Sequence, residues 1–168
     1  MHTIVQTPRL IVREFLPEEE PVYLAHFNDP EVCKHIPKRS RDERINIFRT
    51  AQAKYPDTKQ TGIWGIFDGL NGAFIGSCLL RPYNDEPGKI EVGYSMDKIY
   101  WGKGIATEMV NALVDYAFTY KGTKEVVGIT TLDNIASQRV LEKAGLVRMP
   151  DFEKDGEVVA FFRIKIGD

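Results

Sequence analysis

The sequence has little of several features that would point to particular classes of protein. Its 168 residues include only two cysteines, Cys33 and Cys78, which lie singly in different segments, so no disulfide framework is predicted. No apolar run approaches the length of a membrane span, and the N-terminal stretch lacks the apolar core of a signal peptide. The formal net charge is −2, which gives no electrostatic case for a nucleic-acid ligand. We therefore expect a cytoplasmic protein with neither membrane nor nucleic acid as a partner.

Several site patterns are also missing. His26, Cys33 and His35 have no further ligands at zinc-like spacing, so no metal site is predicted. No Ser-His-Asp or Cys-His arrangement can be argued from spacing. The chain lacks the P-loop pattern GxxxxGK[ST], and the dinucleotide fingerprint GxGxxG/A fails at Thr107. A nucleotide-binding enzyme is therefore a weak alternative.

Apolar periodicity predicts a single domain over residues 1–168 that mixes strands and helices. The composition, 43% hydrophobic and 27% charged, is that of a packed globular chain. Alternating or short apolar runs bounded by turn residues predict strands, and three- and four-residue spacing predicts helices. The expected strands are 9–15, 61–67, 73–80, 90–96, 124–131, 146–152 and 157–166; the expected helices are 17–28, 41–55, 105–120 and 133–145.

A glycine-rich turn, Gly102-Lys103-Gly104, joins the strand 90–96 to the longest apolar helix. The first amides of a helix have no partner within the helix, and the helix dipole places partial positive charge there. Glycines let a phosphate oxygen reach those amides, and Lys103 adds a full charge. The turn therefore predicts an anion site, although a lone GxG can also serve only a tight turn.

The same segment resembles the pyrophosphate loop, [Q/R]xxGx[G/A], of the GNAT superfamily of acetyl-coenzyme A-dependent N-acyltransferases. Trp101 stands where Gln or Arg is usual, and YWGKGIATE closely resembles the RimJ/RimL-like branch of that superfamily. A second stretch, from Asn134 through Ser137 to Leu146, is similar to the family pattern NxxSxxxxEKxGF, with Leu146 in place of Phe. The resemblance covers nearly the whole chain.

The resemblance implies an α/β (α+β) GNAT fold, in which a mixed, mostly antiparallel sheet flanked by helices splays between the fourth and fifth predicted strands. In the family, the pantetheine arm of acetyl-CoA lies in that splay and the pyrophosphate lies on the loop. Asn134 would contact the arm, and Ser137 would lie near the thioester sulfur. The other residues implied to bind acetyl-CoA are Gly93, Tyr94, Ser95, Met96, Trp101, Gly102, Lys103, Gly104, Ile105, Ala106 and Thr107.

Chemistry and the resemblance together suggest catalytic roles for Glu91 and Ser137. An alkylamine is mostly protonated at neutral pH, so a carboxylate on an interior strand, Glu91, is the candidate base. A serine hydroxyl is too weak an acid to hold a proton ready, so Ser137 is expected to act only as a hydrogen-bond donor to the departing thiolate or as a relay through water. A main-chain N–H would stabilise the oxyanion.

The acceptor is expected to be a primary amine, either a protein N-terminus or a small molecule, that attacks acetyl-CoA directly in a ternary complex. Its pocket would be built from the turn 28–36, Trp64, Tyr83 and the hairpin 152–158. The sequence leaves open a monomer or a homodimer. It also leaves open a non-catalytic acyl-CoA-binding or regulatory module on the same fold.

Overall fold

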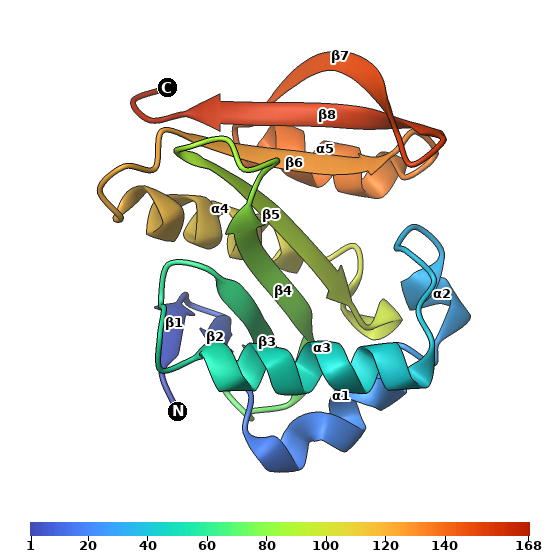
Figure 1. Cartoon of the computed structure of the whole chain (residues 1–168). Helices are drawn as coiled ribbons and strands as arrows, with labels where there is room; N and C mark the ends of the chain where they lie inside the picture. Colours follow the sequence, from blue (N-terminus) through green and yellow to red (C-terminus); the bar gives the residue numbers. More distant parts are fainter.

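Eight strands of the computed structural model, which describes residues 1–168, form one mixed sheet with helices on both faces (Figure 1). The strand order across the sheet is β1-β2-β3-β4-β5-β6-β8-β7. The strands are β1 Thr3–Gln6, β2 Leu10–Arg13, β3 Gly62–Asp68, β4 Phe74–Pro82, β5 Lys89–Met96, β6 Glu125–Thr131, β7 Val147–Lys154 and β8 Glu157–Lys165. The helices are α1 Glu20–His26, α2 Pro30–Cys33, α3 Arg41–Lys54, α4 Ile105–Phe118 and α5 Ile135–Lys143. No helix is both long and apolar enough to cross a membrane.

The mixed, mostly antiparallel sheet predicted from the sequence is confirmed: every neighbouring pair is antiparallel except β5 and β6, which are parallel. One strand was missed. Thr3–Gln6 forms β1 and pairs with β2 across a turn in which Thr7 N donates to Leu10 O at 2.9 Å. Four residues are too few to establish a periodicity, so the pattern gave no signal there.

The two faces of the sheet carry different cores. One face packs against α4, whose Met109, Val110 and Leu113 are fully buried among apolar residues of β2 to β6. The other face packs against α1 and α3 through an aromatic cluster built around Phe15 and Tyr23. In Figure 1, α3 and α1 lie in front of the sheet, whereas α4 and α5 lie behind it.

The central strands β5 and β6 pair over only part of their length. Their register covers Lys89, Ile90 and Glu91 opposite Glu125, Val126 and Val127, and it ends there. β5 nevertheless stays paired with β4 as far as Met96, and β6 stays paired with β8 as far as Thr131. The two strands therefore diverge toward α2 (Figure 1), and the C-terminal half of β5 has an open edge. This is the splay that the family resemblance implied.

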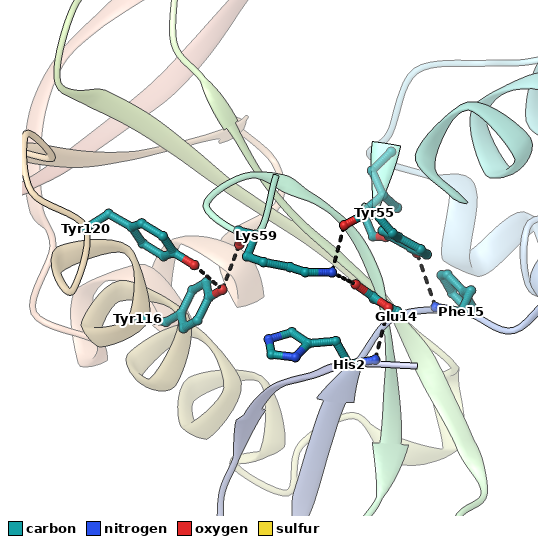
Figure 2. A network of polar contacts seen from close by, with 8 residues as sticks. His2, Glu14, Phe15, Tyr55, Lys59, Tyr116 and Tyr120 are labelled. Carbon is teal, nitrogen blue, oxygen red and sulfur yellow. Dashed lines mark hydrogen bonds and ion pairs between the residues drawn. The ribbon is translucent and has the colours of Figure 1, made fainter. Parts of the chain in front are cut away.

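A network of polar contacts fixes the end of β2, the end of α3 and helix α4 relative to one another (Figure 2). Glu14, 7% exposed, accepts a hydrogen bond from Lys59 Nζ at 2.5 Å, and Lys59 Nζ also donates to Tyr55 O at 2.7 Å. From α4, the Tyr116 hydroxyl donates to Lys59 O at 2.6 Å and contacts the Tyr120 hydroxyl. Because the glycine-rich turn leads into α4, this network also fixes the direction in which the turn faces.

Candidate active site

The turn at Gly102 and Gly104 presents main-chain amides without obstruction. Both glycines have positive φ, +71° and +74°, which L side chains rarely adopt. Gly104 is the N-cap of α4 and offers no capping side chain, so the first amides of the helix are free. A Cβ at Gly102 would meet nothing within 4 Å, and one at Gly104 would meet only Arg9 Nη2, at 3.5 Å. The turn is therefore open to an anion.

Arg9, which sequence reasoning did not assign to the site, anchors this turn. Its Nη1 donates to Lys103 O at 2.7 Å, and its Nε lies 2.6 Å from Glu108 Oε2. The Thr7 hydroxyl donates to the other oxygen of Glu108 at 2.6 Å. The β1–β2 turn thus holds the N-terminus of α4 in place, and it puts the Arg9 guanidinium beside the Gly102–Gly104 turn. Helical spacing alone gives no sign that Glu108 of α4 has a partner 99 residues away in the sequence.

The open edge of β5 presents main-chain donors to the splay. Asp97 N donates to Ile75 O on the β4 side at 2.8 Å. Because N–H direction alternates along a strand, the N–H groups of Tyr94 and Met96 point the other way, toward the open edge. The indole Nε1 of Trp101 donates to Met96 O at 2.9 Å, so the first residue of the turn is fixed to the end of the strand. An extended, amide-bearing arm could pair with this edge while its phosphates lie on the turn.

Tyr94 and Ser137 meet across the splay. The Tyr94 hydroxyl donates to Ser137 Oγ at 3.2 Å, and burial raises the pKa of Tyr94 although the Ser137 contact opposes this. Asn134 is the N-cap of α5, and its side-chain oxygen accepts from Ser137 N at 3.2 Å. The amide oxygen of Asn134 is therefore engaged within the chain, and its amide NH₂ is the group left to face a ligand.

Glu91 lies on the α1/α3 face of β5, 8% exposed, opposite Arg81 of β4. Arg81 Nη2 lies 2.7 Å from Glu91 Oε2. Ser95 lies on the same face of β5, since side chains two residues apart on a strand share a face. Gly93, between them, has no side chain, and the Leu79 side chain of β4 covers it, with Cγ 3.2 Å from where a Cβ would lie. Because Leu79 is partly exposed, a small reacting group could pack against it between Glu91 and Ser95.

Residues from both sides of the splay border this face. His35, from the segment after α2, reaches across to the end of β6, with Nδ1 3.0 Å from Thr131 Oγ1 and 3.4 Å from Asp133 Oδ1. Tyr83 stacks on Phe161 of β8 with ring centroids 6.0 Å apart. The predicted contribution of Trp64 is wrong: its side chain is 1% exposed and packs against Tyr116 of α4, on the opposite face, because alternation along β3 turns it inward.

Three polar side chains that the sequence did not connect meet on this face of β5. His26 of α1 is 4% exposed; its Nδ1 lies 2.5 Å from Asp97 Oδ1 and its Nε2 lies 2.8 Å from Ser95 Oγ. Only tertiary packing brings α1 onto β5, so spacing could not reveal the group.

The Cys33 thiol donates a hydrogen bond to Phe27 O. No group of three His, Cys, Asp or Glu side chains is arranged to hold a metal ion.

Comparison with known proteins gives consistent matches. The family model described as the acetyltransferase (GNAT) domain matches residues 9–147. An uncharacterized N-acetyltransferase, YoaA, of Bacillus subtilis (strain 168) is 28% identical over 160 residues, covering 93% of this chain and 86% of that protein. The FsC-acetyl coenzyme A-N(2)-transacetylase of Aspergillus fumigatus is 30% identical over 134 residues, covering 74% of this chain and 56% of that protein.

Among solved structures, the chain is similar to RimL, a ribosomal L7/L12 alpha-N-protein acetyltransferase, in complex with coenzyme A. The TM-score is 0.82, the identity is 16%, and the match covers 98% of each chain. At this identity the likeness concerns the fold.

Proposed function

Because this chain belongs to the GNAT acetyltransferase family and is an N-acetyltransferase that uses acetyl-CoA, we propose that it transfers acetyl to a primary amine by direct attack in a ternary complex. The observation that carries the proposal is the splay of β5 from β6, with free main-chain donors on β5 and the Gly102–Gly104 turn at its end. We further propose that residues 1–168 act as one acetyltransferase domain, as a monomer or a homodimer.

The residues at the splay fit acetyl-CoA. In the proposed complex the pyrophosphate lies on the α4 N-terminus, where the free amides, Lys103 and the Arg9 guanidinium offer donors and positive charge. The pantetheine arm pairs with the open edge of β5, and Asn134 faces it from α5. The proposed binding set is Gly93, Tyr94, Ser95, Met96, Trp101, Gly102, Lys103, Gly104, Ile105, Ala106, Thr107 and Asn134. When bound, acetyl-CoA supplies the activated acetyl thioester.

Glu91 is the proposed proton acceptor. Arg81 fixes one of its oxygens, and the other would take the proton from an amine directly or through one water. An N–H on the open edge of β5, such as that of Tyr94, would donate to the oxyanion. The hydroxyls of Ser137 and Tyr94 form one hydrogen-bonded pair, so together they would donate to the departing thiolate without either acting as a strong acid.

The acceptor class remains a primary amine of either kind, a protein N-terminus or a small molecule. The α1/α3 face is bordered by aromatic rings, Tyr83 and Phe161, and by the guanidinium of Arg81. The test is an amine panel, containing short N-terminal peptides, polyamines, amino acids and aminoglycosides, incubated with acetyl-CoA and monitored for released thiol and for acetylated product.

The alternative of a non-catalytic acyl-CoA-binding module on the same fold predicts a different result. Such a module would bind CoA without transferring acetyl to any member of the panel. Transfer to at least one amine, lost on replacing Glu91, supports the enzyme. CoA binding without any transfer would support the module.

A further inference from the structure

We propose that Ser95, activated by His26 and Asp97, is a second acetyl acceptor that gives this chain a slow acetyl-CoA hydrolase activity when no amine is bound. The proposal rests on the proposed use of acetyl-CoA but adds a nucleophile on the α1/α3 face of β5. Its basis is the hydrogen-bonded chain Ser95–His26–Asp97, in which His26 and Asp97 have no part in the proposed base or cofactor site.

The three side chains have the connectivity of a nucleophilic triad. Nδ1–H of His26 donates to Asp97 Oδ1 at 2.5 Å, which fixes the tautomer that leaves Nε2 as an acceptor. The Ser95 hydroxyl then donates to Nε2 at 2.8 Å. The edges of Phe27 and Phe74 hold the imidazole, with ring centroids 4.8 and 5.4 Å away. The base is therefore oriented from two sides, as general-base activation of a serine requires.

The imidazole is in the form that can accept a proton. Burial lowers the pKa of His26 below its ordinary value, and this outweighs the opposing effect of Asp97. The other charged groups that face the ring are Asp29, which raises the pKa, and Arg44, which lowers it. The close pair with Asp97 is thus a hydrogen bond from a neutral imidazole rather than an ion pair. His26 itself is buried, whereas Ser95 is partly exposed, so the group reaches a ligand through Ser95.

The proposed reaction balances without a further reagent. Ser95 Oγ bonds to the acetyl carbonyl carbon while its proton passes to His26 Nε2; the C–S bond breaks, and the thiolate takes that proton. Water then attacks the serine ester, again giving its proton to Nε2, and Ser95 leaves with it as the hydroxyl. Ser95 is partly exposed and lies on the half of β5 that is not paired with β6, which gives the acetyl group access to it from the splay. The side chain of Asp97 is 36% exposed, so its hydrogen bond stabilises the His26 imidazole less than a buried carboxylate would. We therefore expect the hydrolase activity to be slow.

The first test needs no coenzyme. The full chain is incubated with a fluorophosphonate, which phosphonylates activated serines, and the labelled peptide is mapped by mass spectrometry. We expect one adduct, on Ser95, absent in Ser95→Ala and retained in Ser77→Ala, the serine directly opposite on β4 whose hydroxyl donates to Trp64 O. Asp97→Asn should label at least tenfold more slowly. The labelling rate should be constant above pH 7 and fall only below the ordinary imidazole value of 6.5.

The second test adds acetyl-CoA without an amine, quenches in acid and looks for an acetyl group on Ser95, together with thiol release that Asp97→Asn slows at least tenfold. Labelling of Ser95 by the fluorophosphonate in a chain that does not bind CoA would contradict the proposed function and leave the activated serine standing. Two results would overturn the triad and leave the proposed function standing. In the first, amines are acetylated normally but Ser95 carries neither a phosphonyl nor an acetyl group. In the second, amines are acetylated normally but Ser95→Ala is labelled as fast as the wild type.

Discussion

Arg81 and Glu91 face each other in register on β4 and β5, with Arg81 Nη2 2.7 Å from Glu91 Oε2. The contact fixes a carboxylate on the α1/α3 face of β5, two residues before Gly93. One oxygen of Glu91 is engaged by the guanidinium, and the other is the atom that would take a proton from an amine.

Glu91→Gln should lower kcat/KM for the true acceptor by about 10²–10⁴, the usual range for a general base, while CoA affinity stays close to that of the wild type. The amide is nearly isosteric, so packing is kept and only proton acceptance is lost. The acidic limb of the pH profile of kcat/KM should disappear or shift. A variant with a near wild-type rate and the same limb would mean that Glu91 is structural.

Tyr94→Phe and Ser137→Ala should each lower kcat/KM by less than about tenfold, since a thiol of ordinary pKa near 8.5 needs little help to leave. The two hydroxyls share one hydrogen bond, so the double variant should lose less than the product of the single effects. The acidic limb should persist in all three. A loss larger than that of Glu91→Gln, measured by steady-state kinetics, would identify one hydroxyl as an essential acid.

Gly104→Ala should weaken CoA binding at least tenfold, because the new methyl group lies on the path of a phosphate to the α4 amides. The matched control is Gly72→Ala, in the β3–β4 turn, where φ is +72° and a Cβ meets nothing within 4 Å; at Gly104 a Cβ would make only an ordinary contact with Arg9 Nη2, at 3.5 Å. Both changes carry a similar backbone cost, about 1–2 kcal/mol for a left-handed L residue. Equal CoA affinity in the two variants, measured by calorimetric titration, would show that the Gly102–Gly104 turn does not bind the phosphates of CoA.

Glu108→Gln should lower the free energy of unfolding at neutral pH and change it little at acidic pH. Burial raises the pKa of Glu108, but hydrogen bonds from Thr7 and Arg9 outweigh it and hold the pKa below its ordinary value of 4.5. Because the pKa of Glu108 is lower in the folded state than in the unfolded state, its interactions stabilise the fold at pH values above 4.5. This stabilisation is lost as the pH falls through the folded-state pKa.

Urea unfolding of wild type and Glu108→Gln at pH 7 and at pH 3 measures this effect. The control is Glu142→Gln on α5, an exposed carboxylate, which should change stability little at either pH. A difference between Glu108→Gln and wild type that is the same at both pH values would contradict the electrostatic account.

Sequence reasoning was most successful where chemistry and periodicity are local. Apolar runs bounded by turn residues predicted the strands that form β3 and β4, and the resemblance predicted the splay. The contacts it missed join distant segments: Arg9 with Glu108, and His26 with Ser95 and Asp97. Trp64 was misplaced because an aromatic residue in a strand gives no sign of which face it occupies until the neighbouring helix is known.

The most direct measurement of the central claim is the thermal stability of the chain with acetyl-CoA, ATP or NAD. A ligand at 100 times its Kd stabilises the native state by about 2.7 kcal/mol, which for a chain of this size is roughly 5–11 °C in Tm. We predict a shift of that order with acetyl-CoA, little with ATP or NAD, and a smaller acetyl-CoA shift in Gly104→Ala than in Gly72→Ala. Equal or larger shifts with ATP, and none with acetyl-CoA, would contradict the account.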